Sequence, residues 1–281
     1  MSEFSCNRLV IIGVGLIGGS IAAALRRAGK VRRIVGVGRG RANIERALEL
    51  KVIDEASDDI PAAVRGADIV LLAVPVQQNE RVLVALAGSI GAETLVTDAG
   101  STKMDFVAAV RRILSLQLAN VIPAHPIAGA ELTGVDAASA GLFVDKNVVL
   151  TPLPENDARA VDRIESMWKV CGARVGRMSP EHHDRVFSAV SHLPHMLAYT
   201  LVHMIATRPD AGELFSFAAG GFRDVAPYLR RTAGNAGEIA EPARGETEQL
   251  AGIGPRGDHV HQGIGEHVRK MADSKIGRAH V

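Results

Sequence analysis

The chain has 281 residues, of which 47% are hydrophobic and 22% are charged, and its formal net charge is +1. This length and apolar content are enough for one large or two medium domains with hydrophobic cores, and they argue against a disordered chain. Because so small a net charge offers no basic face that could neutralise a run of phosphates, nucleic acid is excluded as the expected partner. We expect a small-molecule partner instead.

Cysteine content and one apolar run bear on where the protein works. Cys6 and Cys171 are too few for a disulfide framework and lack metal-ligand spacing, which fits a reducing cytoplasm. Residues 9–25 are almost wholly apolar, but the run contains glycines, is short for a membrane span and is followed directly by Arg26 and Arg27. We therefore expect a soluble cytoplasmic protein with inert thiols, no metal site and no membrane contact.

The first predicted elements are a strand, a tight glycine turn and a helix. Residues 8–12 read as a short buried strand and residues 16–28 as a helix. The turn between them lies in GVGLIG, which has the GxGxxG spacing of dinucleotide-binding turns. In that motif Gly13 allows the turn, Gly15 the close approach of a pyrophosphate, and Gly18 the packing of helix on strand. A purely structural glycine turn is the alternative. The cofactor contacts predicted here are Gly13, Gly15, Leu16, Ile17 and Gly18.

The end of the second predicted strand, RIVGVG, lacks the acidic residue that usually binds the ribose hydroxyls of NAD. Gly38 stands there and is followed by Arg39, Gly40 and Arg41. A guanidinium at this point suits a 2′-phosphate better than a free hydroxyl. We therefore predict cofactor binding by Arg39 and favour NADP over NAD, with tolerance of both left open. The alternative is that Arg39 and Arg41 are solvated loop charges.

Further strands are predicted in ADIVLLAVPV, TLVTDAGS, ANVIPAH and NVVLTPL, with helical patterns between them. This alternation predicts an α/β fold with a Rossmann-like, doubly wound parallel sheet, in which ligands bind beyond the carboxyl ends of the strands. Ser101 and His125 each fall just past such an end. Since histidine titrates near neutral pH, His125 is a candidate general base, and a buried structural histidine is the alternative.

From Pro180 the pattern becomes helical, and the run HHDRVFSAVSHLPHMLAYTLVHMI is apolar on more than one side, as in a bundle or a dimer. Pro194 is expected to kink this run and to turn His192 or His195 out of ordinary helical spacing. The predicted organisation is a dinucleotide-binding domain (1–178), an all-helical substrate and dimerisation domain (179–224) and a tail of atypical composition (225–281).

Several stretches together carry a resemblance to a known family. They are VIIGVGLIGGSIAAAL, AVPV, TDAGSTK, AHPIAGAELTGVDAA, LF before VVLTP, HDRVFSAVSHLPHMLA and GGFRD. In this order, between Arg8 and Asp224, they resemble the prephenate/arogenate dehydrogenase family of tyrosine biosynthesis. The resemblance implies oxidative decarboxylation of prephenate or arogenate to 4-hydroxyphenylpyruvate or tyrosine, with hydride transfer to NAD or NADP, in a homodimer.

The resemblance also implies roles for individual residues. His125 would accept the proton of the ring hydroxyl, and Ser101 would orient that hydroxyl beside the nicotinamide. His195, with His192 as a second candidate, would contact the substrate. The AVPV motif would add Ala73, Val74 and Pro75 to the cofactor site.

The tail departs from the family after Asp224, where a Thr-Arg-Ile-Ala/Ser stretch is expected whose arginine binds a substrate carboxylate. Pro227 stands in that place, and no arginine matches the motif. We hypothesise a frameshift, because one codon choice for PYLR reads Arg-Ile-Ser when shifted by one base, and KIGRAHV can be written as adapter-like DNA. A genuinely divergent, flexible tail is the alternative, and sequencing codons 220–235 of the source DNA separates the two.

An altered tail weakens the expectation of a dimer and would remove a charge-assisted contact to the substrate, for which Arg223, Arg230 or Arg231 could substitute. Two other functions stay open. One is another NAD(P)-dependent oxidoreductase of the 3-hydroxy acid dehydrogenase type. The other is a catalytically impaired NADP-binding protein.

Overall fold

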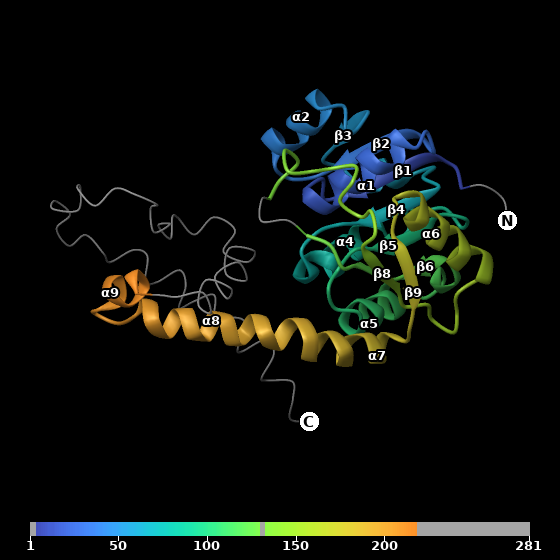
Figure 1. The fold of residues 1–281 in the computed structure, drawn as a ribbon. Helices are drawn as coiled ribbons and strands as arrows, with labels where there is room; N and C mark the ends of the chain where they lie inside the picture. Colours follow the sequence, from blue (N-terminus) through green and yellow to red (C-terminus); the bar gives the residue numbers. More distant parts are fainter. Residues whose placement is uncertain (1–3, 130–132, 218–281) are drawn as a thin grey trace. The chain divides into compact units, whose positions relative to one another are not determined.

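A computed structural model describes residues 4–129 and 133–217 of the chain (Figure 1). The chain divides between Ala189 and Val190 into two compact units. The GGFRD motif and the predicted tail (225–281) lie outside the described residues, and so does the frameshift hypothesis that concerns them.

The first unit is built on a six-stranded parallel sheet with the strand order β3-β2-β1-β4-β5-β6. Its strands are β1 (Cys6–Ile12), β2 (Val31–Val37), β3 (Glu55–Ser57), β4 (Ile69–Leu72), β5 (Leu95–Asp98) and β6 (Val121–Ile122). In register, Val10 of β1 lies between Val35 and Val70. The order reverses at β1, which pairs with β2 on one side and β4 on the other. The predicted doubly wound sheet is confirmed.

Alternate residues of β1 point to opposite faces of the sheet, and both faces are buried. Leu9 and Ile11 belong to one hydrophobic cluster, whereas Val10 and Ile12 belong to the other. The first cluster is covered by α1 (Leu16–Arg27), α2 (Arg41–Glu49) and α6 (Ala158–Val170). The second is covered by α3 (Ile60–Val64), α4 (Asn79–Leu86) and α5 (Met104–Ile113). This two-faced burial explains why the strands read as continuous apolar runs.

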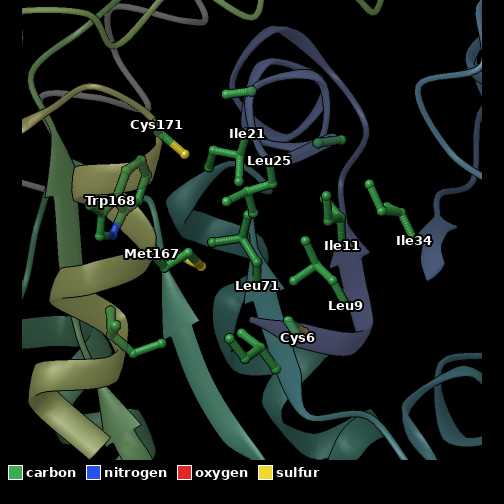
Figure 2. Close-up of a cluster of buried hydrophobic side chains, with 14 of the residues drawn as sticks. Cys6, Leu9, Ile11, Ile21, Leu25, Ile34, Leu71, Met167, Trp168 and Cys171 are labelled. Atoms are coloured by element: carbon green, nitrogen blue, oxygen red, sulfur yellow. The ribbon is translucent and has the colours of Figure 1, made fainter. Parts of the chain in front are cut away.

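Figure 2 shows the first cluster, in which side chains of α1, β1 and α6 meet. The single tryptophan, Trp168, is fully buried and packs edge to face against Phe143 at 5.3 Å between ring centroids. Cys6 and Cys171 lie in the same cluster, where burial raises the pKa of each thiol to about 12. Both thiols are therefore protonated at neutral pH and unreactive, as predicted.

A second, three-stranded sheet corrects one sequence prediction. It contains β7 (Ala124–Pro126), β8 (Asn147–Leu150) and β9 (Arg174–Arg177), and β7 runs antiparallel to β8. The predicted strand ANVIPAH is thus split at Pro123, which has no N–H to continue a ladder. NVVLTPL joins the second sheet, so its placement in the parallel sheet was wrong. His125 follows the carboxyl end of β6, as predicted, but it lies inside a further strand, β7, opposite Val149.

Helices follow β9. They are α7 (Pro180–Phe187), the π-helical turn η3 (Ser188–His192), α8 (Leu193–Ala206) and α9 (Ala211–Ser216). Two 3-10 turns, η1 (Val76–Gln78) and η2 (Leu118–Asn120), occur earlier in the chain. The Ser179 hydroxyl caps α7 by accepting a hydrogen bond from the N–H of His182 at 3.1 Å. A π-helical turn lies directly before Pro194, and the kink predicted at this proline stays a prediction. The predicted domain boundary at residue 179 precedes the division between the compact units and stays a prediction.

No helix within the described ranges combines the length and apolar character needed to cross a membrane.

A fully buried ion pair joins the two sheets. Nζ of Lys103 lies 2.5 Å from Oδ2 of Asp98, at the end of β5, and also donates to the carbonyl of Ala124 at 2.8 Å. The other Asp98 oxygen accepts from the N–H of Ala124 at 3.1 Å. Burial lowers the pKa of Lys103, and the charge and hydrogen bond of Asp98 oppose this effect. The pair therefore fixes the start of β7 against the end of β5.

Lys103→Met leaves the Asp98 carboxylate buried without its counter-charge. We expect this variant to lose about 3–5 kcal/mol of the free energy of unfolding. Asp98→Asn/Lys103→Met removes both charges and is expected to be more stable than the single variant. Urea unfolding, followed by the fluorescence of Trp168, measures the stability of both variants. If the single and the double variant were equally stable, the assigned role of the pair would be contradicted.

Candidate active site

A cavity of about 580 Å³ opens beside the carboxyl ends of the parallel strands. Its walls come from the segments that follow β1, β2, β3 and β4, at the point where the strand order reverses, which is where folds of this kind bind ligands. The lining includes the predicted Gly13, Gly15, Arg39, Ala73, Val74 and Pro75, and also Asn43, Asp58, Asp59, Gln78 and Arg81. The predicted Leu16, Ile17 and Gly18 form the first turn of α1, just behind the glycine turn.

The three glycines of the turn meet different surroundings. Gly13 has φ +99°, and a Cβ there would lie 2.5 Å from the carbonyl oxygen of Ala73. At Gly18 a Cβ would lie 2.2 Å from the Gly13 carbonyl oxygen, so α1 packs directly on the turn. A Cβ at Gly15 would meet nothing within 4 Å. The turn therefore leaves room on its cavity side at the N-terminus of α1, where N–H groups and the helix dipole favour an anion such as a pyrophosphate.

Arg39 and Arg41 differ in where their side chains lie. Arg39 lines the cavity, and its Nη2 donates to Oε1 of Gln78 at 2.9 Å. Arg41 donates instead to Glu45 at 2.8 Å and lies outside the described lining of the cavity. Arg41 is thus a solvated charge at the start of α2, whereas Arg39 presents a cation to the cavity.

Asn43 was missed by the sequence reasoning. Its Nδ2 donates to the Val14 carbonyl at 2.5 Å, and its Oδ1 accepts from the N–H of Val135 at 3.1 Å. One amide side chain therefore ties the glycine turn to the loop that follows β7. Asn within a helix of mixed composition gives no local signal for such a contact.

His125 is half-buried and forms the first link of a hydrogen-bonded chain. Its Nδ1 lies 2.9 Å from Nε2 of His183, and Nδ1 of His183 lies 2.8 Å from Oδ1 of Asp184. His183 is fully buried on α7, and the ring of Phe187 packs edge to face against His125 at 5.0 Å between centroids. Both ring nitrogens of His183 are thus engaged.

Asp184, on α7, is the last member of this series of hydrogen bonds and contacts the start of α5. Its two oxygens accept hydrogen bonds from the backbone N–H groups of Lys103 and Met104, each at 2.9 Å. Burial raises the pKa of the carboxyl, but the hydrogen bonds from His183, Met104 and Lys103 outweigh it and leave the pKa below its usual value. Asp184 is therefore ionised at neutral pH.

Ser101 is exposed at the bend between β5 and α5. The residue before it, Gly100, donates its N–H to Oδ2 of Asp98 at 2.9 Å, and Ala124, the residue before His125, donates to Oδ1. One buried carboxylate thus fixes the backbone next to both predicted catalytic residues. Ser101 follows the carboxyl end of β5, as predicted.

The remaining predicted residues stay predictions. His192 ends the π-helical turn and His195 lies in the first turn of α8, but their side chains are outside the described part of the chain. His183 and Asp184 were missed, although they are the first two residues of HDRVFSAVSHLPHMLA, one of the stretches that carry the family resemblance. Their residue types were visible, but their contact with His125 was not.

Comparisons with known proteins identify the family. The family model "Prephenate dehydrogenase, nucleotide-binding domain" matches residues 21–177, and "Prephenate dehydrogenase, dimerization domain" matches residues 179–242, which extends past Asp224. The cyclohexadienyl dehydrogenase of Zymomonas mobilis is 37% identical over 221 residues, covering 78% of this chain and 75% of that protein. The prephenate dehydrogenase of Bacillus subtilis is 39% identical over 221 residues, covering 78% of this chain and 59% of its own length.

Solved structures give the same result. Prephenate dehydrogenase from Aquifex aeolicus, in complex with hydroxyphenyl propionate and NAD+, matches with a TM-score of 0.75 and 28% identity over 98% of this chain and 87% of that chain. Synechocystis arogenate dehydrogenase matches with a TM-score of 0.66 and 30% identity, over 79% of this chain and 78% of that chain. The 3-hydroxyisobutyrate dehydrogenase of Mycobacterium tuberculosis, at 14% identity, shares the fold alone. The chain therefore belongs to the prephenate dehydrogenase family.

Proposed function

We propose that this chain catalyses the oxidative decarboxylation of prephenate or arogenate, with hydride transfer to NAD(P)+. The observation that carries the proposal is His125, which is held by His183 and Asp184. The Asp98 carboxylate fixes the backbone next to both His125 and Ser101. The family membership and the glycine turn with space at Gly15 support the dinucleotide. The substrate classes come from the relatives named above.

The reaction needs a group that accepts a proton. The bound cofactor supplies the acceptor for the hydride that leaves the ring carbon bearing the hydroxyl group. His125 takes the hydroxyl proton as that carbon becomes carbonyl-like, and Ser101 orients the hydroxyl by a hydrogen bond. The electron pair of the bond to the ring carboxylate then enters the ring as CO2 leaves. The oxygen takes a proton back, and the aromatic product results.

The finer cofactor choice is NADP, and Arg39 supports it. The Arg39 guanidinium lines the cavity beyond β2, where no acidic residue follows the strand. The hydrogen bond to Gln78 holds this guanidinium at the cavity wall, where it can meet a 2′-phosphate. Asp58 and Asp59 also line the cavity, and they favour a cofactor without that phosphate. The affinities for NAD+ and NADP+ show whether the arginine or the aspartates determine the choice of cofactor.

The assembly that fits this chain is a homodimer. On α8, Leu193, Leu197, Leu201 and Met204 recur at helical spacing and are 52%, 63%, 40% and 63% exposed. An apolar stripe of this kind on one helix is typical of an interface. The match to a dimerization domain model supports a second copy as the partner that covers it.

Turnover of prephenate tests the proposed function. We expect the purified chain to reduce NAD+ or NADP+ with prephenate, and His125→Asn to lower kcat by roughly 10²- to 10⁴-fold because the proton acceptor is lost. The Kd of the cofactor should stay within about twofold, since His125 lies outside the described lining of the cavity. Cofactor binding without turnover in the unsubstituted chain would instead favour the impaired NADP-binding protein, and unchanged turnover in His125→Asn would remove the assigned base.

Arg39→Ala tests the cofactor choice. Loss of a charge-assisted contact worth about 1.5 kcal/mol should raise the Kd of NADP+ roughly tenfold and leave that of NAD+ unchanged. Arg41→Ala is the matched control, because Arg41 pairs with Glu45 away from the cavity. Calorimetric titration of the unsubstituted chain and the two variants with each cofactor gives the six affinities. Equal effects of Arg39→Ala on both cofactors would contradict a 2′-phosphate contact.

A further inference from the structure

We propose that His183 and Asp184 are positioning residues that set the tautomer of His125, so that Nε2 of His125 carries the lone pair that takes the substrate proton. The inference deepens the proposed function and rests on it for the role of His125. It stands on the hydrogen-bonded chain that links these three side chains inside the first compact unit. Each link determines the next, starting from Asp184.

Asp184 fixes the direction of the chain because it can only accept hydrogen bonds. Its carboxylate meets the N–H groups of Lys103 and Met104 at 2.9 Å each, and these backbone donors begin α5. Nδ1 of His183 lies 2.8 Å from Oδ1 of the same carboxylate. Since an ionised carboxylate carries no proton, Nδ1 of His183 is the donor in this contact.

A neutral imidazole at His183 determines which nitrogen of His125 carries a proton. The side chain is fully buried, and burying an uncharged imidazole costs less than burying an imidazolium. With its proton on Nδ1, neutral His183 has only a lone pair on Nε2.

His125 is the residue on which the chain acts. Its Nδ1 lies 2.9 Å from the Nε2 lone pair of His183, so Nδ1 of His125 carries the proton and donates it to that bond. The remaining lone pair is then on Nε2, the nitrogen on the other side of the ring. Edge contacts of the ring with His183 and Phe187, both at 5.0 Å between centroids, keep its orientation.

The arrangement has the logic of a catalytic triad, in which an aspartate holds a histidine in the tautomer that can accept a proton. Here an additional imidazole stands between the carboxylate and the base. An isolated histidine in water prefers the opposite tautomer, with its proton on Nε2. The hydrogen bonds from Asp184 through His183 therefore keep His125 in the tautomer with its lone pair on Nε2. Without these partners, a half-buried histidine would not be held in that tautomer.

Nitrogen NMR of the full chain, with ¹⁵N-labelled histidine and at a pH where the imidazoles are neutral, reads the tautomer directly. The His125 signals are assigned by their absence in His125→Asn. We expect the proton on Nδ1 of His125 in the unsubstituted chain. His183→Phe keeps a ring in place but removes the acceptor, so the His125 proton should move toward Nε2. His183→Gln offers an amide oxygen and should keep it on Nδ1.

Kinetics connect the tautomer to catalysis. His183→Phe should lower kcat roughly 10- to 100-fold, with KM and the cofactor Kd within about twofold, as for the loss of a partner that orients a functional histidine. His183→Gln should recover most of the rate. His182→Phe is the matched control, because the same substitution falls on the neighbouring, exposed histidine, and it should leave kcat unchanged.

The outcomes separate this inference from the proposed function. A proton on Nε2 of His125 in the unsubstituted chain overturns the inference whether or not prephenate is turned over, and this measurement needs no variant of His183 to fold. A proton on Nδ1 together with an unchanged kcat in His183→Phe also overturns it. If prephenate is not turned over, the proposed function fails, while the NMR spectrum still decides whether His183 sets the tautomer.

Discussion

The buried carboxylate of Asp98 is the constraint on which the site depends. It ends β5, it is neutralised by Lys103, and its two oxygens accept from the N–H groups of Gly100 and Ala124. Burying two charges is expensive, so such a pair contributes little net stability compared with well-packed apolar residues. Its effect here is geometric. It fixes the backbone next to Ser101 and the backbone next to His125 from one point, although Ser101 follows a strand of the first sheet and His125 lies in the second.

Lys103 extends this constraint to α7. Its ammonium group bonds Asp98, while its backbone N–H bonds Asp184. The start of α5 is therefore connected through one residue to the end of β5 and to the helix that bears His183. The His125 side chain therefore has little freedom to turn. It lies on a strand, and the series of hydrogen bonds that holds it ends at Asp184, which binds backbone N–H groups of α5. This rigidity is what an oriented general base requires.

Local patterns predicted much of this architecture. The strand, turn and first helix follow from apolar periodicity and glycine spacing, and Ser101 was placed at a strand end because buried runs and their ends are local features. The split at Pro123 was not predicted, because a short buried strand reads alike in parallel and antiparallel pairing. His183 was overlooked for a different reason. Its contact with His125 joins residues 58 positions apart, and periodicity carries no information about such pairs.

The groups argued to do chemistry and those argued to bind substrate lie in different stretches of the chain. The glycine turn, Ser101, His125 and its partners all lie before Ala189, in one compact unit. The family arginine that would meet a substrate carboxylate belongs to the stretch after Asp224, where this sequence has Pro227. A change confined to that stretch removes a contact that is present in substrate and transition state alike, which raises KM more than it lowers kcat. An altered tail is thus compatible with an intact proton acceptor. Its effect falls on substrate binding and not on the chemical step.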